Sequence, residues 1–480
     1  MNRPILRLYG LVILLFAVLI AFTSRWTVFE ASSLRSNPLN KRGLLQQQRI
    51  DRGSILAADG TVLARSVKGP EGTYSRGYPT GSEFAHAVGY AYPMTIGQTG
   101  LELSQSDALN GRLSREGLQG ILDQLQGRRL RGDTLVTTLK PSAQRAAIAA
   151  LGEHEGAVVA IEPKTGAVEV LVSTPSYDPN TLKSMRAYET LTHQTSGTPL
   201  VDRATQYGYA PGSTFKVVTA TAAIDSGAFT SQSVVSGRNN VVISGVPLKN
   251  DNNESLGEIT LTQGLAHSVN TVYAQVAERL GKATMARYMA RFGFDRKPRL
   301  DLSTKEMSSS GEYLGPRLIS PLNRNVDVGR MGIGQDKLQV TPLQMAEVAA
   351  AVANQGTLMK PHLTSKIVDP DGRVVKRIEP QVQSVVMKPA TAAAVTGMME
   401  AVVNEGTGTS AQIPGVQVAG KTGTAETQIG QTINNVWFIA FAPARNPSVA
   451  VAVTLKGVPG FGAAFAAPVA KQVMEALLHG

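Results

Sequence analysis

The sequence predicts a mixed α/β fold: a largely antiparallel sheet flanked by helices, preceded by a small, mainly β domain and a single N-terminal transmembrane helix. Three observations support it. An apolar run lies close to the N-terminus, Val-rich runs of strand length occur within residues 156–179 and 436–457, and helical patterns occur near Pro141 and at 467–480. The segment from Pro141 onward is expected to begin and end with a helix, and its last strands lie near the C-terminus. This order favours a largely antiparallel sheet.

The composition limits the class of protein. A chain of 480 residues has room for roughly two to four domains, and 42% hydrophobic residues against 17% charged ones are typical of a sizeable core. The net charge of +11 suits nucleic acid or an anionic cell surface. Nucleic acid is not expected, because no zinc spacing or recognition-helix pattern is present. The absence of cysteine excludes disulfides and thiolate sites. The six histidines show no metal spacing, so no metal or cofactor is expected.

The N-terminus predicts a membrane anchor. Arg3 and Arg7 precede the mostly apolar run 8–23, which Arg25-Trp26 closes. The run is short for a span of about 20 residues, but the flanking arginine and tryptophan can lie at the interface and lengthen it. The positive flank predicts that the first residues stay in the cytoplasm and that the rest is exported. A cleaved signal peptide and a buried core helix are the alternatives.

Short elements are expected up to about residue 132. Residues 24–49 predict a polar juxtamembrane stalk or helix, and Asp59-Gly60 marks the turn of a hairpin within 52–64. The segment 65–105, rich in Gly, Tyr and Pro, predicts short strands and loops. The Arg-rich stretch 111–132 predicts a solvated helix and linker rather than a binding patch.

Longer elements follow. A strand precedes a helix that begins near Pro141, and a hairpin over 156–179 turns at 163–166. Ala-rich helical patterns alternate with loops up to about residue 405. Two strands, at 436–443 and 449–457, precede the final helix.

The first of three short motifs after residue 200 contains a serine and a lysine. Ser213 and Lys216 are three positions apart and follow a Pro-Gly pair. On a helix that starts at Ser213 they share one face, one turn apart. A neutral lysine amine there can take the serine proton, provided that burial or another cation lowers its pKa. The start of such a helix also directs backbone N–H groups at a developing oxyanion.

The second motif is Ser268-Val269-Asn270, and the third is Lys421-Thr422-Gly423-Thr424. The Ser268 hydroxyl can relay a proton, and the Asn270 amide can bind a peptide carbonyl or orient the first lysine. On a strand, alternate residues of the third motif share a face. Gly423 would let a substrate backbone approach closely, and the lysine and threonine groups suit a carboxylate. Each motif alone is common by chance, whereas the ordered trio is specific.

The ordered trio is the signature of penicillin-binding proteins and class A β-lactamases, and the chain resembles a class B penicillin-binding protein. The likeness runs from the membrane span to the last helix, and the short N-terminal domain is most similar to the actinobacterial penicillin-binding protein A type. Further segments that carry it are Arg52–Ile55, Gly97–Glu102, Arg203-Ala204, Tyr209–Gly212, Gly332–Gln335, Val340–Gln344 and Glu405–Gly408. Asp336 stands where the family often has Gly.

The resemblance implies three regions and an activity. Residues 1–24 would be a cytoplasmic tail and transmembrane anchor, 25–150 a non-catalytic pedestal, and 151–480 a transpeptidase domain of the penicillin-binding, serine β-lactamase-like fold. The activity would be peptidoglycan D,D-transpeptidation through a serine acyl-enzyme, with release of D-alanine and inhibition by β-lactams. The implied partners are stem peptides, β-lactams, the membrane and a separate membrane glycan polymerase, because the pedestal is too short for a glycosyltransferase domain.

The resemblance also assigns roles to single residues. Ser213 would be the nucleophile, Lys216 its base, Ser268 a proton shuttle, Asn270 a holder of the donor peptide and Lys421 a support for the proton network. Thr422 and Thr424, on either side of Gly423, would bind the terminal carboxylate, and the backbone N–H groups of Ser213 and Thr424 would form the oxyanion hole.

Three alternatives stay open at this point. A β-lactamase or β-lactam sensor would use the same fold, but a class A lactamase needs a glutamate for deacylation, and no Glu-x-x-Leu-Asn run follows Ser268. A non-catalytic wall-binding scaffold is disfavoured by the intact Ser213, Lys216 and Lys421. A carboxypeptidase would differ only in using water as the acceptor.

Overall fold

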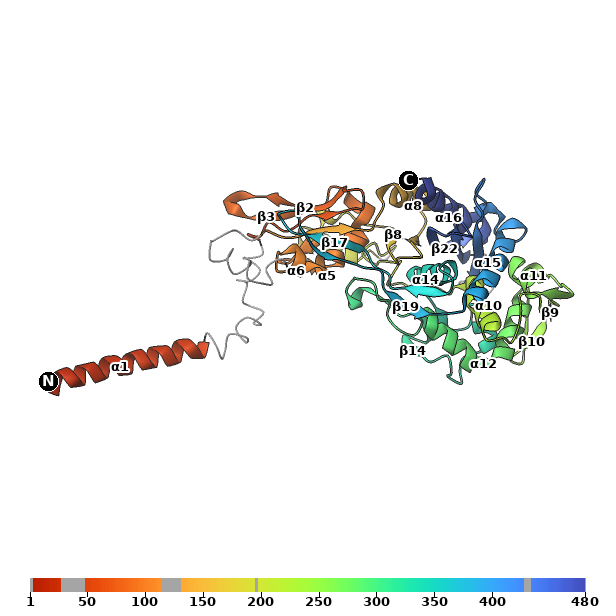
Figure 1. Cartoon of the computed structure of the whole chain (residues 1–480), viewed down its shortest axis with the longest axis horizontal. Helices are drawn as coiled ribbons and strands as arrows, with labels where there is room; N and C mark the ends of the chain where they lie inside the picture. The colour runs from red at the N-terminus through yellow and green to blue at the C-terminus, as the bar shows by residue number, and fades with distance from the viewer. Residues whose placement is uncertain (1–2, 27–47, 114–130, 195–196, 427–432, 480) are drawn as a thin grey trace.

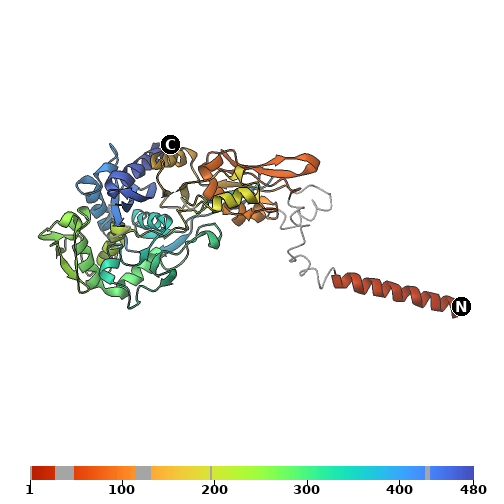
Figure 2. The same cartoon turned by 180° about the vertical axis from the view of Figure 1, so that it is seen from behind.

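The computed structural model describes residues 3–26, 48–113, 131–194, 197–426 and 433–479. Most of the predicted stalk and most of the Arg-rich stretch, residues 27–47 and 114–130, lie outside the described residues. The described chain forms the N-terminal helix and two adjoining globular parts, which Figures 1 and 2 show from opposite sides.

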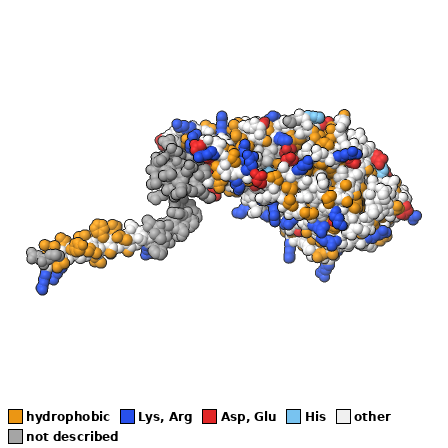
Figure 3. Space-filling view, viewed as in Figure 1, with side chains coloured by type: hydrophobic (Ala, Val, Ile, Leu, Met, Phe, Trp, Pro, Cys, Tyr) orange, Lys and Arg blue, Asp and Glu red, His pale blue; other side chains and the backbone are white. Residues whose placement is uncertain are grey.

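Helix α1 (Arg3–Ser24) has the length and composition of a membrane span. It contains 22 residues, none of them buried, and at 1.5 Å per residue it is roughly 33 Å long, close to the thickness of a bilayer core. Figure 3 shows it as an apolar rod with basic side chains near its N-terminal end. The alternative of a buried core helix is therefore wrong.

The larger globular part is built on a five-stranded antiparallel sheet in the order β20-β21-β22-β7-β8. Its strands are β7 (Gly156–Ile161), β8 (Val168–Thr174), β20 (Ala419–Glu426), β21 (Ile433–Ala442) and β22 (Val449–Pro459). The hairpin predicted at 156–179 and the two late strands are thus confirmed. β20 lies at one edge of the sheet, where it can pair with an extended peptide.

Helices cover both faces of this sheet. Val158 and Val451 point to the face covered by α8 (Pro141–Leu151) and α16 (Gly462–His479). Val159 and Ile439 point to the other face, where every residue of α14 (Pro342–Ala353) is buried. The Val-rich runs therefore have two buried faces, which is why they do not alternate with polar residues.

The final helix starts five residues before the predicted position, at Gly462 rather than at residue 467. The Gly462 N–H donates to Thr424 Oγ1 at 3.4 Å. This contact comes from a distant strand, so the local sequence pattern does not reveal it.

The smaller part is built on a six-stranded sheet in the order β18-β17-β6-β1-β2-β3. Its strands are β1 (Ile55–Leu56), β2 (Val62–Lys68), β3 (Tyr74–Gly77), β6 (Thr134–Thr137), β17 (Thr364–Val368) and β18 (Val374–Arg377). β1 and β2 form the hairpin predicted around Asp59-Gly60. β17 and β18 come from far along the chain, so this sheet crosses the division predicted at residue 150.

The half of the larger part that lies away from the six-stranded sheet contains α10 (Lys216–Asp225), α11 (Leu261–Ala266), α12 (Asn270–Phe292) and α15 (Pro389–Asn404). These helices lie beyond α14 in Figure 1, at the end of the molecule away from the six-stranded sheet. The remaining helices are short: α4 (Ala85–Val88), α5 (Gly100–Ser104), α6 (Ser106–Leu109), α9 (Met185–Thr192) and α13 (Val328–Met331). Two small antiparallel strand pairs, β9 (Val234–Ser236) with β12 (Glu258–Thr260) and β10 (Val241–Ile243) with β11 (Val246–Leu248), pack at the same end.

Candidate active site

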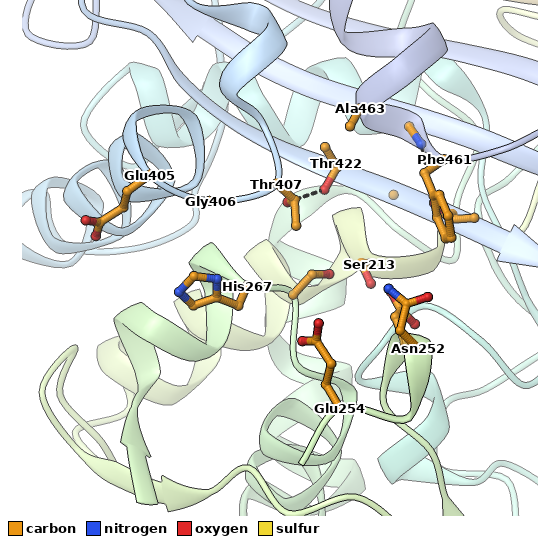
Figure 4. Close-up of a pocket in the computed structure, with 15 residues that line it drawn as sticks. Ser213, Asn252, Glu254, His267, Glu405, Gly406, Thr407, Thr422, Phe461 and Ala463 are labelled. Atoms are coloured by element: carbon orange, nitrogen blue, oxygen red, sulfur yellow. Dashed lines mark hydrogen bonds between the residues drawn. The ribbon is translucent and has the colours of Figure 1, made fainter. Parts of the chain in front are cut away.

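A cleft of about 380 Å³ opens beside the edge strand β20 and brings the three motifs together (Figure 4). Residues from β20, the α11–α12 junction and the turn before α10 line it. They are Ser213, Asp251, Asn252, Glu254, His267, Ser268, Glu405, Gly406, Thr407, Thr422, Gly423, Thr424, Phe461, Gly462 and Ala463.

Ser213 lies on a 3₁₀ turn rather than at the start of an α-helix as predicted. The turn, η5 (Gly212–Phe215), leads into α10, which begins at Lys216. It is tight because Gly212 has φ +52° and its N–H donates to the Gly334 carbonyl at 3.0 Å. Ser213 is 9% exposed and lines the cleft, and its hydroxyl makes no hydrogen bond with any described residue. The serine oxygen is therefore presented to whatever enters.

Glycines let the backbone of this turn approach β20 directly. A Cβ on Gly212 would lie 2.4 Å from the Thr424 oxygen, and a Cβ on Gly334 would lie 2.0 Å from the Gly212 oxygen. A Cβ on Gly423 would lie 2.7 Å from the Pro211 oxygen. Gly423 thus makes room for the serine-bearing turn. The sequence interpretation, in which it makes room for substrate, was incomplete.

Lys216 is fully buried and points at the second motif. Its Nζ donates to the Ser268 carbonyl at 2.6 Å and to Asn270 Oδ1 at 2.7 Å, and lies 3.4 Å from Ser268 Oγ. Burial lowers the pKa of Lys216 to about 7, against an opposing effect of the Asp251 carboxylate. A large share of this amine is therefore unprotonated near neutral pH, as a general base requires.

Lys421 approaches the same hydroxyl from the strand side. Its Nζ donates to Ser268 Oγ at 3.0 Å and to the Thr422 carbonyl at 2.9 Å. Burial holds the pKa of Lys421 well below its usual value, and Lys216 lowers it further. The hydroxyl of Ser268 therefore bridges two buried amines that disfavour each other's charge.

Ser268 is held in a left-handed conformation, with φ +58°. It follows the C-cap of α11, and the Ser268 and Val269 N–H groups donate to the Leu265 and Gly264 carbonyls. This is the Schellman pattern, in which glycine is the usual residue. A serine at that position costs backbone strain, and such strain is typical of functional sites.

Asn270 has both ends of its amide engaged. Its Oδ1 accepts from Lys216, and its Nδ2 donates to the Lys249 carbonyl at 3.2 Å and to Asp251 Oδ1 at 3.1 Å. Of the two roles left open by the sequence, the geometry favours orienting Lys216. Asp251, which the sequence interpretation missed, carries no local signal because it lies 19 residues before Asn270.

The strand side of the cleft presents hydroxyl groups. Thr422 Oγ1 and Thr407 Oγ1 are 2.6 Å apart, and Thr424 Oγ1 accepts from the Gly462 N–H. The sequence assigned Thr407 no role of its own and included it only in the segment Glu405–Gly408. Its contact with Thr422 shows that it lies beside the third motif. Within the described ranges, no group of three His, Asp or Glu residues is arranged to hold a metal ion.

Comparisons with known proteins agree with this geometry. The family model described as the penicillin-binding protein transpeptidase domain matches residues 156–475, and that of the penicillin-binding protein A dimerisation domain matches residues 52–135. The chain is 35% identical over 503 residues to the peptidoglycan D,D-transpeptidase PbpA of Mycolicibacterium smegmatis, covering 100% of this chain and 99% of the relative. It is 35% identical over 509 residues to PbpA of Mycobacterium tuberculosis, covering 100% of both.

Solved structures give the same result. The ceftriaxone acyl-enzyme complex of penicillin-binding protein A from M. tuberculosis is similar with a TM-score of 0.81 and 34% identity, covering 90% of this chain and 100% of that one. The imipenem acyl-enzyme complex of the same protein is similar with a TM-score of 0.80 and the same identity and coverage.

Proposed function

Because the chain belongs to the penicillin-binding protein transpeptidase family, we propose that it is a peptidoglycan D,D-transpeptidase. The family and the fold expected from the motifs are thereby confirmed. The proposed substrate is a stem peptide that ends in two D-alanines. The serine takes the acyl group, the terminal D-alanine leaves, and an acceptor amine from a neighbouring strand resolves the ester as a crosslink. A β-lactam mimics the donor and leaves a slowly hydrolysed ester.

The observation that carries this proposal is the meeting of two buried lysine amines at Ser268, in the cleft that Ser213 also lines. The Ser213 hydroxyl has no partner among the described residues. In the proposed mechanism Lys216 takes the Ser213 proton as the oxygen attacks. Ser268 and Lys421 pass a proton towards the leaving amine. Asn270 keeps Lys216 in place through its Oδ1, while its Nδ2 is held by the Lys249 carbonyl and Asp251.

The donor is proposed to lie along β20. An edge strand offers backbone groups for an extended peptide, and the hydroxyls of Thr422 and Thr424 face the cleft where its terminal carboxylate would end. The close packing of Gly212 on Thr424 supports an oxyanion hole formed by the N–H groups of Ser213 and Thr424.

We also propose that α1 anchors the enzyme in the cytoplasmic membrane as a single span, with the catalytic part outside the cytoplasm. The basic residues before the span support this orientation. A glycan polymerase in the same membrane would supply the strands, a partner proposed from the family resemblance alone.

Product analysis tests the function against its alternatives. The purified full-length protein is given a donor peptide ending in D-alanyl-D-alanine together with an acceptor peptide. A crosslinked product and free D-alanine are expected. Hydrolysed donor alone would indicate a carboxypeptidase, rapid turnover of a chromogenic cephalosporin a β-lactamase, and no reaction with peptide or penicillin a scaffold.

A further inference from the structure

The two sides of the cleft differ in charge. The β20 side presents the hydroxyls of Thr407, Thr422 and Thr424, whereas the side formed by residues 251–254 presents the carboxylates of Asp251 and Glu254. Among the described residues that line the cleft there is no Lys or Arg. This is unexpected in a chain of net charge +11, and it makes one wall suited to a cation.

Glu254 is the carboxylate best placed to act on a bound group. Figure 4 shows its side chain reaching into the cleft below Ser213, whereas Glu405, at the far end, points away. Glu254 is exposed, and its carboxylate makes no ion pair or hydrogen bond with any described residue. Asp251, by contrast, is already engaged with Asn270.

The backbone that carries Glu254 is fixed. The Glu254 carbonyl accepts from Asn250 Nδ2 at 3.0 Å, and its N–H donates to the Asp251 carbonyl at 3.1 Å. Asn252 and Asn253, which lie between Asp251 and Glu254 in the chain, have φ values of 53° and 55°. Their left-handed conformation holds a tight turn, so the carboxylate is carried on a preorganised segment.

The same cleft contains a second sign that a reactant is received there. Ser213 is more than nine-tenths buried, lines the cleft, and has a hydroxyl without a partner among the described residues. The carboxylates of residues 251–254 therefore lie in the same cleft as the proposed nucleophile, Ser213, and not on an ordinary solvated surface.

We propose that Glu254 binds the acceptor of the transfer reaction, a primary amine that enters the cleft as its ammonium ion. This inference rests on the proposed function. After the acyl-enzyme has formed, the ammonium loses one proton to the solvent at the open cleft. The free amine then attacks the acyl carbon, so that the C–N bond forms and the C–Oγ bond of Ser213 breaks, while a second amine proton passes to Ser213 Oγ.

The same charge would help to sort the two substrates. A donor or a β-lactam carries a carboxylate, which Glu254 repels and the threonine hydroxyls accept. An acceptor ammonium has the opposite preference. Glu254 thus favours the arrangement in which the donor carboxylate lies at the threonine hydroxyls and the acceptor ammonium lies at the acidic wall. It disfavours the arrangement in which the two reactants exchange places.

The test separates acceptor binding from acylation. Full-length protein in detergent is acylated with an N-acyl-D-alanyl thioester and offered Nα-acetyl-lysine amide, whose amine is charged at neutral pH, or hydroxylamine, which is mainly neutral. The ratio of aminolysis to hydrolysis is measured for each acceptor. The matched control is Glu258→Gln, since Glu258 is an exposed glutamate on β12 that does not line the cleft.

Glu254→Gln is expected to lower the ratio for the lysine derivative about three- to fivefold, the effect of losing an exposed ion pair. The ratio for hydroxylamine should not change, and acylation by penicillin should be no slower than in the wild type, because the variant no longer repels the penicillin carboxylate. Added salt should reduce the preference of the wild type and leave that of the variant unaltered. An equal loss for both acceptors, or no loss, overturns the inference while the proposed function stands. A wild type that forms no acyl-enzyme overturns both.

Discussion

Two buried lysine amines on either side of one serine hydroxyl determine how this site can carry protons. Lys216 and Lys421 both approach Ser268 Oγ, and burial lowers the pKa of each. Protonation of one amine disfavours protonation of the other, so the pair titrates as a unit. The site therefore holds a base without histidine, although His267 lies in the cleft.

The pKa of Lys216 predicts the pH dependence of acylation. The amine must be unprotonated to accept the Ser213 proton, so the rate of acylation by penicillin should fall as the pH drops through about 7. Asp251 opposes the lowering of both lysine pKa values. Asp251→Asn removes that charge and keeps an oxygen for Asn270 Nδ2, so the acid limb should move to lower pH. Stopped-flow acylation rates across pH measure this, and an unchanged profile, or one moved to higher pH, would contradict it.

The sequence predicted the residues of the three motifs but not their neighbours. Ser213 and Lys216 are close in the chain, so a local turn is enough to bring them together. Asp251 and Thr407 reach the site only through tertiary packing, and neither is marked by a pattern that local reasoning can detect. The assignment of Gly423 to substrate approach was incomplete for the same reason, because its close neighbour, Pro211, comes from a distant segment.

At the scale of helices, strands and turns, the contact between η5 and the loop that contains Gly334 fixes the position of Ser213. Gly334 has φ +78°, and a Cβ there would meet the Gly212 oxygen at 2.0 Å. Gly334→Ala must displace the serine-bearing turn, and a shift of about 1 Å can cost on the order of a hundredfold in rate. We expect that loss in penicillin acylation, with the circular dichroism spectrum retained.

Gly397→Ala is the matched control for this substitution. Gly397 lies within α15 and has open space where its Cβ would be. Alanine favours the helix by roughly 0.5–1 kcal/mol, so acylation should be unchanged and the melting temperature equal or slightly higher. Equal acylation rates in the two variants would show that the packing of Gly212 on Gly334 does not position Ser213.

Elements with a strong local pattern were predicted well. The hairpin at 156–179, the helix at Pro141 and the late strands follow from β-branched runs, turn residues and helical spacing. The 3₁₀ turn at Ser213 was not predicted, because it depends on the glycine contacts with β20 and Gly334. α16 starts earlier than predicted, at Gly462, whose N–H donates to Thr424 Oγ1.

Across the whole chain, the predicted pedestal (25–150) and the predicted transpeptidase domain (151–480) both contribute strands to the six-stranded sheet. β17 pairs with β6 although more than 200 residues separate them in sequence. The sheet therefore contains strands from both sides of residue 150, and the domain boundary there stays a prediction. Strand pairing over such a distance leaves no local signature. The family resemblance, by contrast, covered the full length and was confirmed in both halves.

The position of the chain in the membrane can be tested with the full-length protein carrying a C-terminal tag. Since α1 is apolar, exposed and preceded by arginines, the tagged chain should stay in the membrane fraction at high salt, with its N-terminus intact. Protease added to spheroplasts should degrade the tagged part. A soluble chain that has lost its first residues would instead indicate a cleaved signal peptide, and protection from protease would indicate the reverse orientation.

Mass spectrometry of the benzylpenicillin adduct tests the central claim most directly, because it locates the reacting atom without assuming a substrate. The full-length wild type should gain one penicilloyl group, carried by the peptide that contains Ser213, and Ser213→Ala should gain none. An adduct on another residue, such as Ser268, or a labelled Ser213→Ala protein, would contradict the account.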